Sequence, residues 1–226
     1  MTMNSIMETV CLICTHVRHR TKQDTSFPKL LVELRREFKR AGLDVKIKSQ
    51  SKKFLDTEEF YVNAYYDPED DQNKETPIEI IIYHNFDKEV IWSRRQITDL
   101  LIQVFDATIH EFKHQRQSRK RGYKEFHIRA DAEHEFHEYL QDPDELDAYA
   151  LSITIELCRT VGKFRALRYM PKFTTLARFK VNKEFVSPNL NAYVSHFETP
   201  VSPLLRKLAK KVYVRLKKID TDFIFM

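Results

Sequence analysis

Apolar and polar positions follow two different periods along the chain, and the changes of period mark the predicted elements. Over residues 26–41, a Ser-Phe-Pro start precedes apolar positions at helical spacing, and Gly42 ends the helix. Strand-like patterns follow in "LDVKIKS" (43–49), "FYVNAYY" (60–66) and "PIEIIIYH" (77–84). An acidic polar loop, "DPEDDQNKE", is predicted between the last two strands.

Helical periodicity returns from residue 93 to about residue 117. One apolar stripe predicts a buried face, and a polar seam beside it carries His110 and His114. A second long helix is predicted over 142–162, after an Asp-Pro start. The last third is predicted to be irregular until an amphipathic basic helix at Pro203–Ile219. The pattern predicts an α+β fold with a mainly helical C-terminal part.

Length and composition suit one domain, or one domain with a helical appendage, since the chain has 226 residues, 42% of them hydrophobic. The apolar stretch Thr9–Thr15 is too short to span a membrane, and it lacks the flanks of a signal peptide, so we expect a cytoplasmic protein. Three cysteines argue against a disulfide framework. The Cys11-x-x-Cys14 pair is interpreted as reduced thiols.

Basic residues gather in two clusters, although the net charge is only +5. Such stripes favour an acidic partner or nucleic acid, and they are also typical of solvated helix faces. The first cluster comprises Lys113, Arg116, Arg119, Lys120, Arg121 and Lys124, and the second comprises Arg206, Lys207, Lys210, Lys211, Arg215, Lys217 and Lys218.

The polar seam contains the motif His-Glu-x-x-His at His110, Glu111 and His114. Residues four apart lie one turn above each other on a helix, so both imidazoles can reach one metal ion at about 2.0–2.1 Å. Glu111 is then placed to accept a proton from a water molecule at that ion. A catalytic zinc site needs a third protein ligand from another element, and the 142–162 helix offers Glu145 and Asp147 in its first turns.

"TIHEFKHQRQ" followed by "LQDPDELDAYALS" resembles zincin-type metallopeptidases, in which H-E-x-x-H precedes P-x-E-x-x-A by some thirty residues. Such pairs occur in small peptidases of tailed bacteriophages and, more distantly, in the ImmA/IrrE-like group. The resemblance covers about 45 residues. It implies a zincin-like domain over 1–165, with a small mixed or antiparallel sheet packed on the active-site helix, followed by an extension over 166–226.

The resemblance also implies roles for individual residues. His110, His114 and Glu145 would bind zinc, and Glu111 would be the general base. Asp147 is the alternative carboxylate ligand. Asp142-x-x-Glu145 also resembles a capping box, in which Glu145 would instead bond to the cap backbone. His134 or His137 would replace Glu145 in a site of the SprT-like type.

Further residues are candidates for supporting roles. Asp106 would orient a histidine ring as a hydrogen-bond acceptor, and Tyr123, His127 or Tyr149 would donate to a developing oxyanion. Residues 77–84 would form an edge strand along which a peptide lies, or else an ordinary central strand.

The function that the resemblance implies is zinc-dependent hydrolysis of peptide bonds in a protein or peptide substrate. The resemblance to bacteriophage peptidases implies that such an enzyme acts in a host cytoplasm or in a virion. One alternative is a nucleic-acid-binding or virion structural component that contacts other virion proteins, with a structural or vestigial metal site. Another is amide hydrolysis of a non-protein substrate. The sequence leaves the substrate and the oligomeric state open.

Overall fold

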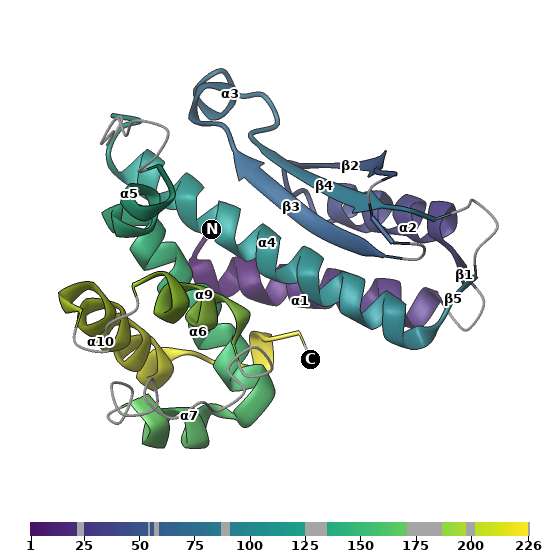
Figure 1. Cartoon of the computed structure of the whole chain (residues 1–226). Helices are drawn as coiled ribbons and strands as arrows, with labels where there is room; N and C mark the ends of the chain where they lie inside the picture. The colour runs from purple at the N-terminus through teal and green to yellow at the C-terminus, as the bar shows by residue number, and fades with distance from the viewer. Residues whose placement is uncertain are drawn as a thin grey trace. The chain divides into compact units, whose positions relative to one another are not determined.

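The computed structural model describes residues 1–21, 25–53, 55–56, 59–86, 91–124, 135–170, 187–197 and 202–225. They form a mixed α and β architecture (Figure 1). The chain divides into two units, one of Met1–Tyr123 with Phe225–Met226 and one of Lys124–Ile224. This division falls earlier than the boundary expected near residue 165, because the helix over 143–161 packs with the helices that follow it.

The first unit contains a three-stranded sheet of β2 (Val45–Ser51), β3 (Phe60–Tyr66) and β4 (Ile78–His84). The strand order is β2-β4-β3, with β4 parallel to β2 and antiparallel to β3. The three stretches predicted as strands are thus confirmed. Of the two alternatives for residues 77–84, the central strand is confirmed and the edge strand is not: β4 is the centre, where Ile78, Ile80 and Ile82 are buried, and β2 and β3 are the edges.

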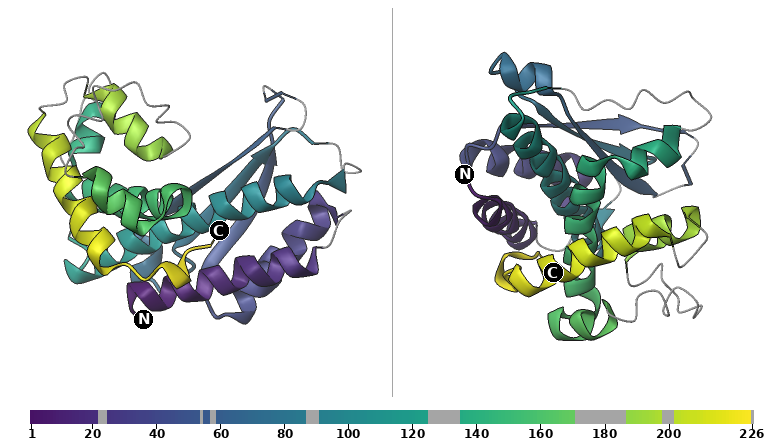
Figure 2. Two further views of the ribbon diagram at one scale, coloured as in Figure 1. Left: turned by 90° about the horizontal axis from the view of Figure 1, so that it is seen from below. Right: turned by 90° about the vertical axis from the view of Figure 1, so that its left-hand side faces the viewer.

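Three helices of this unit support the sheet: α1 (Met3–Arg20), α2 (Phe27–Arg40) and α4 (Arg94–Lys120). Helices α2 and α4 pack against strands, and α1 packs against both helices (Figures 1 and 2). The predicted start of α2 is confirmed, with Ser26 as its N-cap. Helix α4 begins after Ser93, whose side chain and that of Gln96 form a reciprocal capping box.

Shorter elements complete the first unit. Strands β1 (Thr25–Ser26) and β5 (Ile91–Trp92) pair antiparallel in a small second sheet. Part of the predicted acidic loop is helical, because Asp67 caps α3 (Pro68–Gln72) by accepting bonds from two backbone N–H groups.

The second unit is helical in its described part. It comprises α5 (Glu135–Gln141), α6 (Pro143–Val161), α7 (Lys163–Tyr169), α9 (Pro188–His196), α10 (Pro203–Lys218) and the 3₁₀ turn η3 (Thr221–Phe223). Helix α6 packs with α5, α7, α9 and α10. The predicted amphipathic helix is confirmed as α10, whose Leu205, Leu208, Val212 and Leu216 are buried.

Two expectations from composition can be compared with this structure. Cys11, Cys14 and Cys158 are all free thiols, which confirms that the cysteines do not form a disulfide framework. Within the described residues, no helix combines the length and the apolar character that crossing a membrane requires.

Candidate metal centre

Helix α4 holds the His-Glu-x-x-His motif on a rigid support. Its buried residues include Leu101, Val104 and Phe105, which are fully enclosed, and it packs against β3, β4 and α1. His110 and His114 are half-buried, so the predicted polar seam lies beside the apolar stripe. Because the core fixes this helix, the side chains of the motif need little further ordering when a ligand binds.

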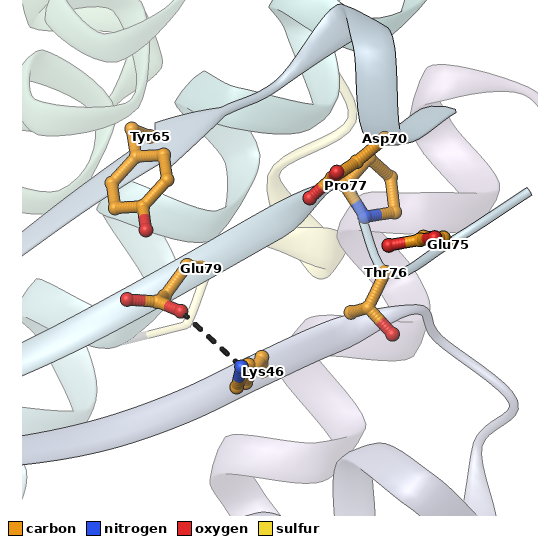
Figure 3. Close-up of a pocket in the computed structure, with 7 residues that line it drawn as sticks. All are labelled: Lys46, Tyr65, Asp70, Glu75, Thr76, Pro77 and Glu79. Carbon is orange, nitrogen blue, oxygen red and sulfur yellow. Dashed lines mark ion pairs between the residues drawn. The ribbon is translucent and has the colours of Figure 1, made fainter. Parts of the chain in front are cut away.

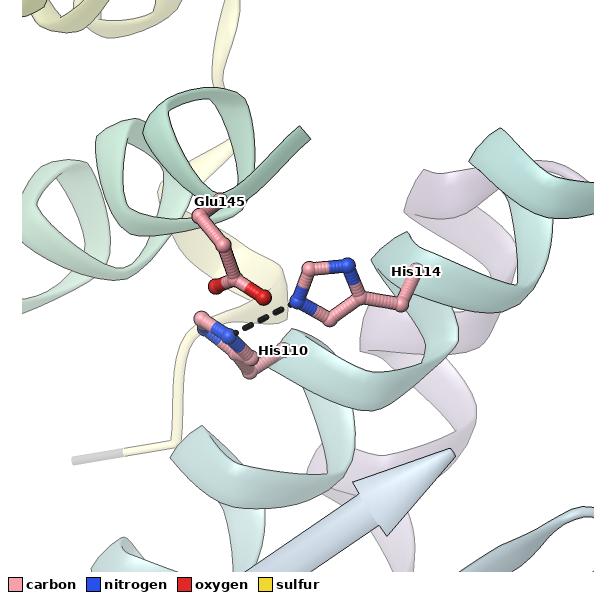
Figure 4. A group of neighbouring side chains, drawn as sticks. All are labelled: His110, His114 and Glu145. Carbon is pink, nitrogen blue, oxygen red and sulfur yellow. Dashed lines mark hydrogen bonds between the residues drawn. The ribbon is translucent and has the colours of Figure 1, made fainter. Parts of the chain in front are cut away.

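The two imidazole rings face each other across one helical turn. The Nε2 atoms of His110 and His114 are 3.0 Å apart, with ring centroids 4.8 Å apart and planes inclined by 64° (Figure 4). Two ligands about 2.0–2.1 Å from one tetrahedral ion are about 3.3–3.4 Å apart. The ring nitrogens are therefore close to the separation that a shared ion would impose.

Glu111 and Asp106 lie on the same helix. Glu111 is buried, with 8% of its surface exposed, and follows His110 directly in the chain. Because burying an anion is costly, a buried carboxylate beside the histidine pair is a candidate for a chemical or structural role. Asp106 is half-buried one turn before His110, which is the position from which a ring can be oriented.

Glu145 lies in the first turn of α6, in the second unit. Oδ1 of Asp142 caps this helix by accepting bonds from the backbone N–H groups of Asp144 at 2.7 Å and Glu145 at 3.3 Å. These two bonds of the cap involve the backbones of Asp144 and Glu145 and not the Glu145 carboxylate. Ala148, one turn later, is fully buried, in keeping with the small residue that the resemblance implies there.

Three tyrosines surround the start of α6. Tyr149 contacts the rings of Tyr139 and Tyr193, at centroid distances of 6.4 Å and 5.4 Å. Burial, together with the nearby Glu145 carboxylate and Tyr149, raises the pKa of the Tyr139 and Tyr193 hydroxyls well above their usual value. Tyr139 also hydrogen bonds with Glu145. Tyr139 and Tyr193 escape sequence analysis because no motif marks them.

Asp147, the alternative carboxylate, is engaged by α10. Its Oδ1 accepts hydrogen bonds from Lys211 Nζ at 2.9 Å and from Arg215 Nη2 at 2.7 Å. The backbone carbonyl of Asp147 accepts a further bond from Arg215. A carboxylate held by two cations has less capacity for an additional metal ion, so Glu145 is the stronger candidate.

Tyr123 has a partner that the sequence does not reveal. Its hydroxyl donates to Oδ2 of the buried Asp71, which also accepts from Tyr66 and Arg119. Gln115 donates to Oδ1 of the same carboxylate. Tyr123 has a left-handed backbone with φ of 60°, and this bond fixes its side chain at the end of α4. The arrangement assigns Tyr123 a structural contact.

Other predicted residues lie outside the described part of the chain. His127 and His134 fall within residues 125–134, and the side chain of His137 is likewise not described. Comparisons of the chain with protein-family models, with curated proteins and with solved structures find no match. The geometry of the site therefore carries the functional argument.

Proposed function

We propose that the protein is a zinc-dependent peptidase of the zincin type, with His110, His114 and Glu145 as metal ligands and Glu111 as general base. Figure 4 draws the three ligand side chains of this proposal. The observation that carries it is the imidazole pair on α4, whose Nε2 atoms are 3.0 Å apart. Glu145, in the first turn of α6, is the third ligand in this proposal.

The donor set fits a catalytic zinc ion. Two imidazole nitrogens and one carboxylate oxygen form a ligand set of known metallopeptidases, which leaves a fourth position for water or substrate. Both Nε2 atoms must be unprotonated to bind an ion. The 3.0 Å hydrogen bond between the two rings requires one of them to carry its proton on Nε2, so metal binding shifts that proton to Nδ1.

Each residue then has a distinct task. A zinc ion held by His110, His114 and Glu145 would polarise the scissile carbonyl and lower the pKa of water to about 7. Glu111 accepts the proton of the attacking water and passes it to the amine that leaves. Tyr149 is a candidate donor to the developing oxyanion, and Tyr139 orients the Glu145 carboxylate through its hydrogen bond.

An extended substrate would pair with β3, because β3 rather than β4 is an edge strand beside α4. Two backbone N–H groups of β3 already have side-chain acceptors. Val62 N–H donates to Gln103 Oε1 at 3.0 Å, and Ala64 N–H donates to Asn63 Oδ1 at 3.0 Å. A peptide that adds to this edge would displace the Gln103 side chain from Val62.

The test is the metal content of the purified chain, measured by elemental analysis without chelator. We expect one zinc ion per chain in the wild type and its loss in His114→Ala and in Glu145→Ala. His19→Ala is the matched control, because His19 is an exposed histidine on α1. A wild-type chain without transition metal, or a Glu145→Ala chain with full metal, contradicts the proposed site.

Hydrolysis is tested separately with a mixture of unmodified peptides analysed by mass spectrometry. We expect new termini with the wild type and none with His114→Ala. Full metal binding without cleavage of any peptide would contradict the peptidase function and leave the metal site itself standing.

A further inference from the structure

The sheet of the first unit has one face that the helices of this unit do not cover. Alternate residues of β3 show this, because Tyr61, Asn63 and Tyr65 are exposed while the residues between them are half-buried toward α4. Tyr61 and Tyr65 expose 38% and 47% of their surface. Exposed aromatic side chains that gather on one face can mark an interaction site.

The strand registers arrange this face in three rows. Gln50, Tyr83 and Tyr61 form the first row, Lys48, Ile81 and Asn63 the second, and Lys46, Glu79 and Tyr65 the third. In the first row, the rings of Tyr61 and Tyr83 stack at a centroid distance of 4.7 Å and an interplanar angle of 21°. Lys52 Nζ lies 5.1 Å from the centroid of the Tyr83 ring. An aromatic platform with a cation beside it therefore occupies one end of the face.

The charges on this face are unevenly distributed. Lys46 pairs with Glu79 of its own row, so the third row is close to neutral, and Lys48 of the second row also pairs with Glu79. The three residues of the third row line a cavity of about 420 Å³, together with Asp70 and Glu75 among others (Figure 3). This end repels anions, whereas Lys52 and the exposed Lys53 make the aromatic end positive.

We propose that this face binds a strand of unpaired nucleotides, with bases stacked on Tyr61 and Tyr83 and phosphates near Lys48 and Lys52. Stacking on aromatic side chains beside positive groups is how sheets bind single-stranded nucleic acid. The acidic cavity limits the strand to the aromatic end. The surface is independent of the motif residues, and it differs from the basic clusters of α4 and α10.

The test is equilibrium binding of labelled oligothymidylate and oligouridylate, roughly 12 nucleotides long, measured by fluorescence anisotropy. We expect the wild type to bind both single strands more tightly than a duplex of equal length. Tyr61→Leu removes the ring and should weaken binding by about 5- to 100-fold, whereas Tyr61→Phe keeps the ring and the affinity. Lys52→Gln should reduce the slope of log affinity against log salt by about 0.7.

Variants with substitutions on α7 and α10 test whether other surfaces of the protein bind the nucleic acid. Tyr169→Leu is the control for an exposed tyrosine on α7, with 44% of its surface exposed, and it should bind like the wild type. Lys207→Glu with Lys210→Glu removes exposed charge from α10 and should have little effect. The proposal is overturned if no single strand binds, if the duplex binds equally well, or if only the α10 variant loses affinity. The proposal would also be overturned if the wild type bound peptides but no nucleic acid, and if Tyr61→Leu abolished the peptide binding.

Discussion

Arg215 of α10 donates a hydrogen bond of 2.7 Å to Oδ1 of Asp147 in α6, and Lys211 donates to the same atom at 2.9 Å. Both cations belong to the C-terminal basic cluster that the sequence presents as a surface for an acidic partner. The structure instead uses two members of that cluster inside the second unit. The other five members remain exposed, so a surface for an acidic partner would rest on Arg206, Lys207, Lys210, Lys217 and Lys218.

Replacement of Asp147 by Ala should lower stability and leave metal binding intact. Lys211 and Arg215 are both less than one-third exposed, so the loss of their acceptor should cost about 1–2 kcal/mol. Thermal unfolding measures this change, and elemental analysis measures the metal. Glu145→Ala should show the reverse pattern. If Asp147→Ala loses the metal while Glu145→Ala keeps it, Asp147 is the third ligand.

Glu111→Gln should abolish hydrolysis while the metal content stays that of the wild type. The amide has nearly the same shape as the carboxylate but cannot accept the proton, and loss of a positioned general base typically costs about 10²–10⁴-fold in rate. Cleavage rates on a peptide identified with the wild type give the measurement. A Glu111→Gln protein with an unchanged rate would exclude Glu111 as the base.

Asp71→Asn should destabilise the first unit by about 2 kcal/mol, because the carboxylate joins α3 to Gln115, Arg119 and Tyr123 at the end of α4. Burial acts to raise the pKa of Asp71, but the hydrogen bonds from Arg119, Tyr66 and Tyr123 outweigh it and the pKa is lowered. A lowered pKa contributes stability above the unfolded value of 3.8, and that stability is lost as the pH falls through the folded value. The difference between wild type and Asp71→Asn in chemical unfolding should therefore shrink below about pH 4. Glu69→Gln, on the exposed side of α3, should unfold like the wild type.

His84→Phe should remove part of the loss of stability in mild acid. Burial lowers the pKa of His84 from 6.5, and its ring lies 4.6 Å from Phe27. Because the unfolded chain binds this proton more readily, the neutral ring contributes stability above about pH 6.5, and the contribution is lost as the pH falls through the folded value. Urea unfolding at a series of pH values should show a smaller decline for His84→Phe than for the wild type. If the wild type and His84→Phe lose the same stability as the pH falls, His84 does not control the loss of stability in mild acid.

Local patterns predicted the elements that carry the site. Helix α4 could be predicted because its apolar stripe and polar seam persist over many turns, and α6 because Asp142-Pro143 marks its start. The half-buried histidine pair and the cap at Asp142 follow directly from these patterns. Helix α1 was not predicted, since its apolar stretch is short and polar residues interrupt its buried face.

Relationships between distant parts of the chain could not be predicted in the same way. The position of β4 in the sheet depends on which strands pair with it, and its isoleucine run is compatible with an edge or a centre. The bond from Tyr123 to Asp71 joins residues 52 positions apart, and the bond from Arg215 to Asp147 joins residues 68 positions apart. Tertiary packing selects such pairs, and no spacing rule marks them.

Phe225 belongs to the first unit, where it is 1% exposed, lies 6.4 Å from the Phe105 ring and has Arg18 4.9 Å from its own ring centroid. The second unit is therefore tethered to the first at both of its ends, by the covalent chain after Tyr123 and by this aromatic anchor. In the proposed site, closure of this loop would raise the effective concentration of Glu145 at the histidine pair. If Glu145 is the third ligand, release of Phe225 would therefore weaken metal binding, although Phe225 itself binds no metal.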